Sequence, residues 1–418
     1  MGERTRTEVA NSCPTEDALP IQNMHNLHVS MSDEWPDVPL TEAIVRNHVG
    51  RDNQIPASEI HASGAFPVVD QGQAFIAGYC NEERRVIRDE LPLVIFGDHT
   101  RCFKYVDFPF ILGADGTKVL KPDTGQFDPR FFYYALLNLD MPSRGYNRHF
   151  KQLKEKFIPK PPKAEQQNIA AVLGAVQRAM EQQERLIEKT AELKKTLLHQ
   201  LFSRGLRGEP QKETDIGPIP QSWTIRACEE LCDTITVGVV VQPARHYVQK
   251  GIPAFRSMNV REDRLETEGL VYFSEVENET VLAKSKLRTG DVLIVRTGYP
   301  GTSCVVPPEF DGTNCIDLVF ARPKQSRVMS GYLSRYFNSP GGKAQAVAAK
   351  HGLAQQHLNV GAVKRVNVPL PSLDEQAEID DSLATVQTKL LQHRYKHATL
   401  TALFHALLQQ LMTAQIRI

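Results

Sequence analysis

The chain has 418 residues, 41% of them hydrophobic, and its 49 basic and 49 acidic side chains give a formal net charge of zero. This length and composition favour two or three folded domains and exclude a chain that is disordered throughout. Because no apolar run approaches the ~18 to 20 residues of a membrane span, and the N-terminus lacks the basic-then-apolar order of a secretion signal, we expect a cytoplasmic protein.

Residues 1–33 are polar, mixed in sign and without sustained periodicity, which predicts a flexible N-terminal tail. Residues 34–157 are expected to form a first globular domain. Short apolar runs bounded by turn residues, AFPVV at 65–69 and PLVIFG at 92–97, predict strands, and the aromatic-rich RFFYYALLN at 130–138 predicts a helix. The expected domain is a strand-rich core closed by a helix.

Residues 158–210 are expected to form a long central helix. Prolines at 159, 161 and 162 end the preceding structure, and Glu165 falls in the first turn, where the helix dipole favours an acid. Side chains then recur with the 4,3 spacing of a coiled-coil seam, which Gln183, Thr190 and Lys194 make more polar in its second half. The seam residues that we expect to pack on a second helix are Ile169, Leu173, Val176, Met180, Leu197 and Leu201.

Residues 211–367 are expected to form a second globular domain, and residues 368–418 a C-terminal helix. Apolar runs DVLIVRTG at 291–298, SCVVPP at 303–308 and DLVFARP at 317–323 predict strands, and GYLSRYFNS at 331–339 predicts a helix. If the two long helices pair antiparallel, Ile169 faces Leu411 and Gln183 faces His397. The apolar seam residues of the second helix are Ile379, Leu383, Val386, Leu390, Leu407 and Leu411.

The chain repeats itself. PKPPKAEQQNIAAVL at 159–173 returns as PLPSLDEQAEIDDSL at 369–383, and at this offset of 210 residues 14 of 45 positions are identical between 158–202 and 368–412. The two tryptophans, Trp35 and Trp223, are 188 residues apart, and each is followed by glutamate at +7 and glycine at +15. The sequences between share little, which indicates two half-proteins with a similar frame and different contents.

Basic residues concentrate just before the long helix in each half. No Asp or Glu occurs from Leu318 to Leu373, where there are eight basic residues, and in 141–163 seven basic residues accompany Glu155 alone. One interpretation is a solvated basic face. The other is phosphate binding, since clustered Lys and Arg release counterions from DNA, and RGYNRHF at 144–150 and KHGLAQQHLN at 350–359 add side chains suited to base edges.

Catalytic and cofactor motifs are missing from the sequence. GKA at 342–344 lacks the first glycine and the hydroxyl of a nucleotide-binding loop, and G-x-G-x-x-G, G-x-S-x-G and H-E-x-x-H do not occur. The seven cysteines form no C-x-x-C pair, and we interpret His393 and His397 as seam positions rather than metal ligands. We therefore expect a non-catalytic chain without a metal site or a cofactor of its own.

The phrase P-x-P-x-x-x-E-Q-x-x-I-x-x-x-L that opens each long helix, the W…E…G start of each half, and LRTGDVLIVRTGYPGTSCVV at 287–306 resemble the specificity subunit of a type I restriction-modification system. The resemblance covers about residues 35–418. It implies a mixed α/β fold in which two target recognition domains each read one half of an asymmetric bipartite DNA target. The two helices would form an antiparallel coiled coil, arranged as a pseudo-twofold internal repeat, that fixes the unread spacer.

The resemblance also implies the partners of such a subunit. They are double-stranded DNA, two modification subunits that carry S-adenosylmethionine and flip out the target adenine, and restriction subunits that use ATP and Mg²⁺ for translocation and cleavage. The tail before Trp35 and the polar seam positions Thr190 and Lys194 depart from the family's pattern.

Side-chain chemistry selects candidate DNA-binding residues in the two basic regions and in the glycine-containing loop after the run 291–298. They are Arg144, Asn147, Arg148, Lys151, Arg296, Tyr299, Lys343, Lys350, His351, Gln355, Gln356 and Arg365.

Two other classes of function remain open. One is a coiled-coil scaffold whose two domains bind peptides and which has no role on DNA; the basic regions argue against it. An autonomous methyltransferase or nuclease is the other class, and the missing catalytic motifs argue against that one.

Overall fold

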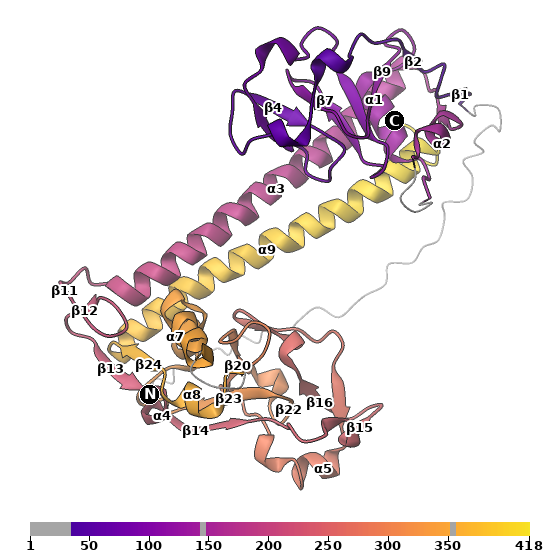
Figure 1. Ribbon diagram of the computed structural model, residues 1–418. Helices are drawn as coiled ribbons and strands as arrows, with labels where there is room; N and C mark the ends of the chain where they lie inside the picture. Colours follow the sequence, from indigo (N-terminus) through magenta and orange to yellow (C-terminus); the bar gives the residue numbers. More distant parts are fainter. Residues whose placement is uncertain (1–34, 143–147, 352–356) are drawn as a thin grey trace, which may run out of the picture. The chain divides into compact units, whose positions relative to one another are not determined.

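The computed structural model describes residues 35–142, 148–351 and 357–418 (Figure 1). The chain forms two compact units. Unit 1 runs to Gly174 and includes Ala406–Ile418, and unit 2 comprises Ala175–His405. The long helices α3 (Lys163–Arg204) and α9 (Leu373–Met412) each contribute to both units. Each unit is therefore one globular domain combined with parts of two long helices.

Unit 1 contains two four-stranded sheets with the orders β2-β9-β6-β7 and β3-β8-β4-β5. The first is antiparallel throughout, whereas β8 pairs in parallel with both β3 and β4. The central strand β6 is buried along its whole length. The strands are β2 (Ile44–Val45), β3 (Gln54–Ile55), β4 (Phe66–Val69), β5 (Gly78–Cys80), β6 (Leu93–Gly97), β7 (Phe103–Val106), β8 (Ile111–Gly113) and β9 (Thr117–Pro122).

The helix α1 (Pro129–Leu137) packs on β7 and buries its aromatic side chains. It starts there because the Asp128 carboxylate accepts hydrogen bonds from the Arg130 and Phe131 amides and Pro129 occupies the first helical position. After it come the short helix α2 (Phe150–Lys154) and the strand β10 (Phe157–Pro159), which pairs with β1 (Asp37–Pro39). This pair ends the domain directly before α3.

Unit 2 repeats the first sheet as β14-β23-β20-β21, again antiparallel, and has a second sheet β15-β19-β16-β22. The helix α6 packs on β20, β21 and β23, as α1 packs on β7 in unit 1. The strands of these sheets are β14 (Cys232–Val237), β15 (Tyr247–Val248), β16 (Ile252–Phe255), β19 (Val271–Phe273), β20 (Val292–Val295), β21 (Ser303–Val305), β22 (Asn314–Cys315) and β23 (Leu318–Pro323).

The remaining elements of unit 2 complete the domain and join it to the long helices. The hairpins β11–β12 and β17–β18 and the pair β13–β24 are antiparallel. These elements are β11 (Gln211–Lys212), β12 (Ile219–Pro220), β13 (Thr224–Ala227), α4 (Cys228–Leu231), β17 (Val260–Arg261), β18 (Arg264–Leu265), α5 (Glu275–Glu279), α6 (Ser330–Asn338), α7 (Pro340–His351), α8 (Val360–Lys364) and β24 (Asn367–Leu370).

All five apolar runs quoted from the sequence form strands, namely β4, β6, β20, β21 and β23, and the two aromatic-rich pieces form α1 and α6. The two long helices are also present, at 42 and 40 residues. The mixed α/β prediction is therefore confirmed at the level of elements. What the sequence did not reveal is how closely the two units correspond in detail.

The strand pairs that frame each domain have matching registers. Asp37 pairs with Pro159 in unit 1, and Ile225 pairs with Pro369 in unit 2. The first members of the two pairs are 188 residues apart (225 − 37), and the second members are 210 residues apart (369 − 159). These are the two offsets found in the sequence. Both units therefore use the same residues of the frame to bring the start and end of the domain together.

The glutamine of the repeated phrase makes the same three hydrogen bonds in both units. Gln166 is buried, accepts from the Asp128 amide at 2.7 Å and donates to the carbonyls of Gln126 and Pro161. Gln376, also buried, accepts from the Met329 amide at 2.9 Å and donates to the carbonyls of Arg327 and Pro371. One side chain thus binds the loop before α1 or α6 to the start of the long helix.

The glutamate of the phrase lies in the first helical turn, as predicted, and it also contacts the repeated tryptophan region. Glu375 accepts from the Leu206 amide at 2.9 Å and from the Trp223 indole at 3.2 Å. Glu165 forms a bidentate ion pair with Arg417, whose guanidinium lies over the Trp35 ring. The glutamates therefore join the start of one long helix to the residues that follow the other.

Candidate nucleic-acid interface

The β20–β21 loop, residues 296–302, contains two of the candidate DNA-binding residues of unit 2, Arg296 and Tyr299. Gly298 and Gly301 have φ of 84° and 86°, a left-handed conformation that glycine adopts without strain, and they form a tight turn around Tyr299. The Tyr299 side chain is 83% exposed. Such an exposed aromatic group on a rigid turn is suited to contact an external partner rather than the core.

A cavity of about 690 Å³ lies beside this loop. Apolar side chains dominate it, and its charged lining residues Lys343 and Arg261 are paired with Glu262 and Glu266. Its other lining residues include Met258, Val260, Thr297, Tyr299 and Val347. The cavity therefore brings together Tyr299 and Lys343, two of the residues selected from the sequence.

The loop also contacts the segment before α8. The Leu358 amide donates to the Arg296 carbonyl at 3.1 Å, and the Arg296 guanidinium donates back to the Leu358 carbonyl at 3.1 Å. The same guanidinium is paired with Asp317, and the Thr297 hydroxyl lies 2.8 Å from His357 Nδ1. Arg296 therefore holds the loop in place, and its side chain is only 15% exposed.

Unit 1 has a related arrangement after its own central strand. The Asp98 carbonyl accepts from the His149 amide at 2.9 Å, and its carboxylate accepts from the Phe150 amide at 2.7 Å. Both Asp98 and His149 are buried. In each unit, then, the residue that follows the central strand binds the segment leading into the short helix α2 or α8.

A cavity of about 520 Å³ lies at the β6–β7 loop of unit 1. Phe75, Arg101 and Met141 are among its lining residues, and so is Lys104. The Lys104 ammonium is buried and donates to the carbonyls of Asp70 at 2.8 Å and Ala74 at 2.6 Å. Burial lowers the pKa of Lys104, and the nearby Asp70 carboxylate opposes that shift.

The described candidate DNA-binding residues fall into two groups. Four are exposed and free of the ion pairs described above: Arg148 and Lys151 in unit 1, and Tyr299 and Arg365 in unit 2. Arg296 and Lys343 are instead paired with Asp317 and Glu262. Lys350 and His351 belong to α7, but their side chains lie outside the described part of the structure, and so do the residues Arg144, Asn147, Gln355 and Gln356.

Within the basic block from 318 to 373, Arg322, Arg335 and Lys343 are paired with acids from other parts of unit 2. Arg322 makes a bidentate pair with the buried Asp291, at 2.8 and 2.7 Å, and Arg335 is paired with Asp263 and Asp380. Lys324 and Arg327 both donate to the backbone carbonyl of Glu230, which carries no net charge. A count of charges along the sequence could not reveal the ion pairs, because the partners lie up to 81 residues away.

Within unit 2 the two long helices run in opposite directions. Gln183 of α3 contacts His393 of α9 at 2.9 Å, whereas Arg207, just after α3, contacts Glu378 near the start of α9 at 2.6 Å. The expectation that Gln183 faces His397 is wrong by one helical turn, since His397 lies 3.1 Å from Glu184 instead. The opposing positions are staggered, so the partner of each seam residue is not fixed by simple end-to-end counting.

The twelve predicted seam residues are all at least half-buried. Those that are buried outright are Ile169, Leu173, Leu201, Ile379, Leu383, Leu390 and Leu411, and those that are half-buried are Val176, Met180, Leu197, Val386 and Leu407. Lys194, which was expected to make the seam more polar, is also buried, but it contacts acids of the globular domain.

Little in the described residues suggests catalysis. The thiols of Cys304 and Cys315 are fully buried, and burial raises the pKa of each well above its ordinary value, which disfavours a reactive thiolate. No three His, Cys, Asp or Glu side chains converge as a metal site within residues 35–142, 148–351 and 357–418. In that same part of the chain no helix is long and apolar enough to cross a membrane.

No protein-family model matches the chain. Among curated proteins, it is similar to type I restriction enzyme specificity subunits. The MjaX subunit of Methanocaldococcus jannaschii is 26% identical over 178 residues, which are 40% of each chain. The EcoBI subunit of Escherichia coli is 24% identical over 277 residues, which are 61% of this chain and 58% of the relative. The match thus spans about half the length of these relatives.

Two solved structures share the fold. The S subunit of a type I restriction-modification system from M. genitalium has a TM-score of 0.62 at 16% identity, over 92% of this chain and 98% of the other. A chain from a study of complex assembly and conformational transition in a type I system has a TM-score of 0.52 at 18% identity, with the same coverage. The resemblance to type I specificity subunits seen in the sequence is therefore confirmed, in its curated relatives and in its fold.

Proposed function

We propose that this chain is the DNA sequence-specificity subunit of a type I restriction-modification complex, and that each globular domain reads one half of an asymmetric bipartite target. The observation that carries the proposal is the duplicated frame. The first sheet has the same strand order in both domains, and the framing registers and the buried glutamine contacts also correspond. Their loops differ, as expected if the frame presents two readers of different sequences.

The reading surface of the second domain is proposed to be the β20–β21 loop with the adjoining cavity. Tyr299 and the cavity's apolar wall are suited to contact base edges and thymine methyl groups in the major groove, while the exposed Arg365 is suited to phosphates. In the first domain the corresponding surface is proposed to include the β6–β7 loop, Arg148 and Lys151. Loops on a rigid sheet are where recognition residues commonly lie.

The two long helices are proposed to form an antiparallel coiled coil that sets the spacing between the half-sites. At 42 residues and about 1.5 Å per residue, α3 is about 63 Å long. Half-sites one turn of DNA apart are separated by roughly 34 Å, so a helix of this length can carry two readers on one duplex. The opposite directions of α3 and α9 in unit 2 support the antiparallel arrangement.

Chemistry is proposed to reside in partner subunits. Two modification subunits would dock on the helices, carry S-adenosylmethionine and methylate an adenine that they flip out of the duplex. Restriction subunits would use ATP and Mg²⁺. This chain's own contribution would be binding and placement, in keeping with the buried thiols of Cys304 and Cys315.

The test is reconstitution of the chain with its modification subunits, followed by sequencing of methylated adenines. We expect one asymmetric motif with two read halves and an unread spacer. Alanine at Lys151 and Arg365 should each lower the slope of log affinity against log salt by about 1, since each removes one phosphate contact. Alanine at Lys189 and Lys396, which are exposed on the long helices, serves as the matched control.

Each outcome separates the proposal from its alternatives. A complex that neither binds DNA selectively nor methylates it would contradict the proposal and favour a peptide-binding scaffold. Methyl transfer or DNA cleavage by the purified chain alone would instead indicate an autonomous enzyme. Unchanged salt slopes in both alanine variants would remove these two residues from the interface.

A further inference from the structure

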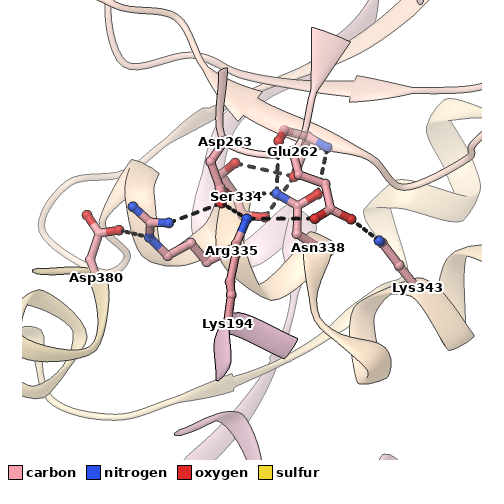
Figure 2. Close-up of polar contacts among 9 residues, drawn as sticks. Lys194, Glu262, Asp263, Ser334, Arg335, Asn338, Lys343 and Asp380 are labelled. Carbon is pink, nitrogen blue, oxygen red and sulfur yellow. Dashed lines mark hydrogen bonds and ion pairs between the residues drawn. The ribbon is translucent and has the colours of Figure 1, made fainter. Parts of the chain in front are cut away.

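A buried ionic network joins the second domain to both long helices (Figure 2). Lys194 of α3 lies 2.7 Å from Asp263, in the turn between β17 and β18, and 3.7 Å from Glu262. Arg335 of α6 lies 3.2 Å from the same Asp263 oxygen and is also paired with Asp380 of α9. The Asp263 carboxylate in this hairpin is therefore paired with a lysine of a long helix and with an arginine of the helix α6.

The network continues to the base of the β20–β21 loop. The Asp263 amide donates to the Ser303 carbonyl at 3.0 Å. Asn338 binds both residues, because its side-chain amide donates to Asp263 at 3.0 Å and to the Ser303 carbonyl at 2.9 Å, and its oxygen accepts from the Ser303 amide at 3.0 Å. Unbroken polar contacts thus run from the first residue of β21 to α3 and α9.

Burial makes these contacts sensitive to the loss of one partner. The side chains of Lys194 and Asp263 are each 6% exposed, and that of Arg335 is 10% exposed. Charges in such surroundings are held by their partners, and removing one leaves the other buried and unpaired. Asp263 also has φ of 63°, which aspartate and asparagine tolerate better than most residues.

The corresponding positions of the repeat do not carry these charged residues. At the offset of 210 residues, Lys194 corresponds to Phe404 and Asp380 to Ala170. The helices α1 and α6 have the same length, and each begins one residue after the residue whose amide binds the repeated glutamine. Aligning the two helices in this way matches Arg335 with Tyr134. All three counterparts are uncharged and buried. The repeated frame therefore forms without the ions, so the network serves something particular to the second domain.

We infer that Lys194, Asp263, Arg335 and Asp380 are positioning residues that fix the second reading domain at one angle on its helices and thereby restrict the spacer length that the complex accepts. This inference rests on the proposed function. Lys194 and Arg335 hold Asp263 through buried ion pairs, and directional hydrogen bonds join Arg335 to Asp380 and Asn338 to Asp263. Buried charges that must keep their partners restrict geometry more than apolar packing of the same area does, because apolar contacts can slide. A loosened domain should still read its own bases but tolerate a displaced half-site.

The experiment uses the full chain assembled with its modification subunits. Methylation rates are measured on the native target, on targets with the spacer shortened or lengthened by one base pair, and on targets with one changed base in either half. For Lys194→Met we expect the preference for the native spacer to fall roughly tenfold, the size typical of lost coupling in a buried network. Base preference in both halves should be unchanged, and Lys194→Arg should restore the spacer preference.

Lys195→Met is the matched control, because Lys195 is the next residue and is exposed. Asp380→Asn is a second test variant with a smaller expected effect, because Asp380 is 23% exposed and contacts Arg335 alone within the network. If Lys194→Met fails to assemble, Asp380→Asn decides by the same measurement. An assembled variant that keeps the full spacer preference overturns the inference, and so does an equal loss of base preference in both halves.

Failure of the inference is distinguishable from failure of the proposed function. If the unmodified complex selects no bipartite target, the proposed function fails. If it selects one, and an assembled network variant keeps its full spacer preference, only the positioning role is wrong.

Discussion

The two units place different polar side chains on the corresponding edge strand of the first sheet. Lys104 of β7 pairs with Ile95 of the central strand β6, and Ser303 of β21 pairs with Ile294 of the central strand β20. Lys104 sends its ammonium to the loop before β5, whereas Ser303 is bound to Ser334 and Asn338 of α6. The same strand therefore supports a neighbouring loop in unit 1 and the covering helix in unit 2.

A second comparison concerns the acid before each central strand. In unit 1, Glu90 pairs with Lys121 of β9 at 2.9 Å, and in unit 2, Asp291 pairs with Arg322 of β23. Both pairs join the start of the central strand to its neighbour, but Asp291 is fully buried and Glu90 is not. The units thus keep a common geometry while burial and charge vary, which allows the reading surfaces to differ without a change of fold.

The largest loss of stability is expected when the buried glutamine that both units share is replaced. Gln376→Leu removes three hydrogen bonds of a fully buried side chain, and it leaves the Met329 amide and two carbonyls unpaired. We expect unit 2 to lose about 3 kcal/mol of stability or more, measured by urea unfolding with hydrogen exchange to assign the unit. Gln166→Leu should do the same to unit 1.

The repeat itself supplies the control for these glutamines. Gln182 and Gln392 are also identical at the offset of 210, but both are exposed. Leucine at either should change stability by less than about 0.5 kcal/mol. Equal effects of all four substitutions would show that the buried contacts do not account for the repeated phrase.

Lys104→Met should loosen only the first unit. It leaves the Asp70 and Ala74 carbonyls without their donor, while relief of the buried charge offsets part of the cost, so we expect about 2 kcal/mol of destabilisation. Faster hydrogen exchange in residues 70–77 is the measurement. Under the proposed function, affinity for the first half-site should fall and that for the second should not.

Ser303→Ala is the comparable substitution on the corresponding edge strand of unit 2. It removes one hydroxyl that donates to the Ser334 carbonyl at 2.7 Å, which predicts a smaller loss of about 1 kcal/mol. If Lys104→Met weakens both half-sites equally, the two units are not independent readers.

The sequence predicted the elements well because their signals are local. Prolines at 159 and 369 and acids in the next turn mark the starts of α3 and α9, and short continuous apolar runs mark β6 and β20. The 4,3 spacing selected twelve seam residues, all at least half-buried. The partner of Gln183 was wrong by one turn, because spacing fixes the face of a helix and not the stagger between two helices.

The candidate site was less predictable because it depends on contacts between distant residues. Arg335 was counted as part of a basic block, yet it is balanced by Asp263 and Asp380. Lys194 was assigned to the helix seam, yet it binds that same Asp263. The identity of Gln166 with Gln376 was visible in the sequence and signalled a shared role, but not the three hydrogen bonds that explain it.

Tyr299→Ala should weaken binding to the second half of the target and leave recognition of the first half unchanged. Because Tyr299 is 83% exposed, the substitution should leave unit 2 as stable as before. Loss of an interfacial tyrosine typically costs about 1 to 2 kcal/mol of binding, a factor of roughly 5 to 30. We expect this loss on targets whose second half is intact and no change in first-half base preference, measured by competition with targets altered in one half.

Tyr395, which is 77% exposed on α9, provides the control for that substitution. Tyr395→Ala should not alter base preference in either half. A Tyr299→Ala complex with unchanged second-half affinity would remove the β20–β21 loop from the proposed interface.

Glu90→Gln tests the smaller difference between the paired acids. Hydrogen bonding to Lys121, with a further contribution from His48, lowers the pKa of Glu90 from its ordinary 4.5 to about 2. Because the folded pKa lies below the unfolded one, the pair stabilises unit 1 fully above about pH 4.5, and this contribution is lost as the pH falls through about 2. Allowing for solvent screening, we expect Glu90→Gln to cost about 1 kcal/mol at pH 7. The stability difference from the unmodified chain should shrink steadily between pH 4.5 and 2, and unit 2 should be unaffected. Unfolding curves at pH 7, 4 and 2.5 measure it, and a difference that stays constant with pH would mean that the effect comes from packing of the side chain and not from its charge.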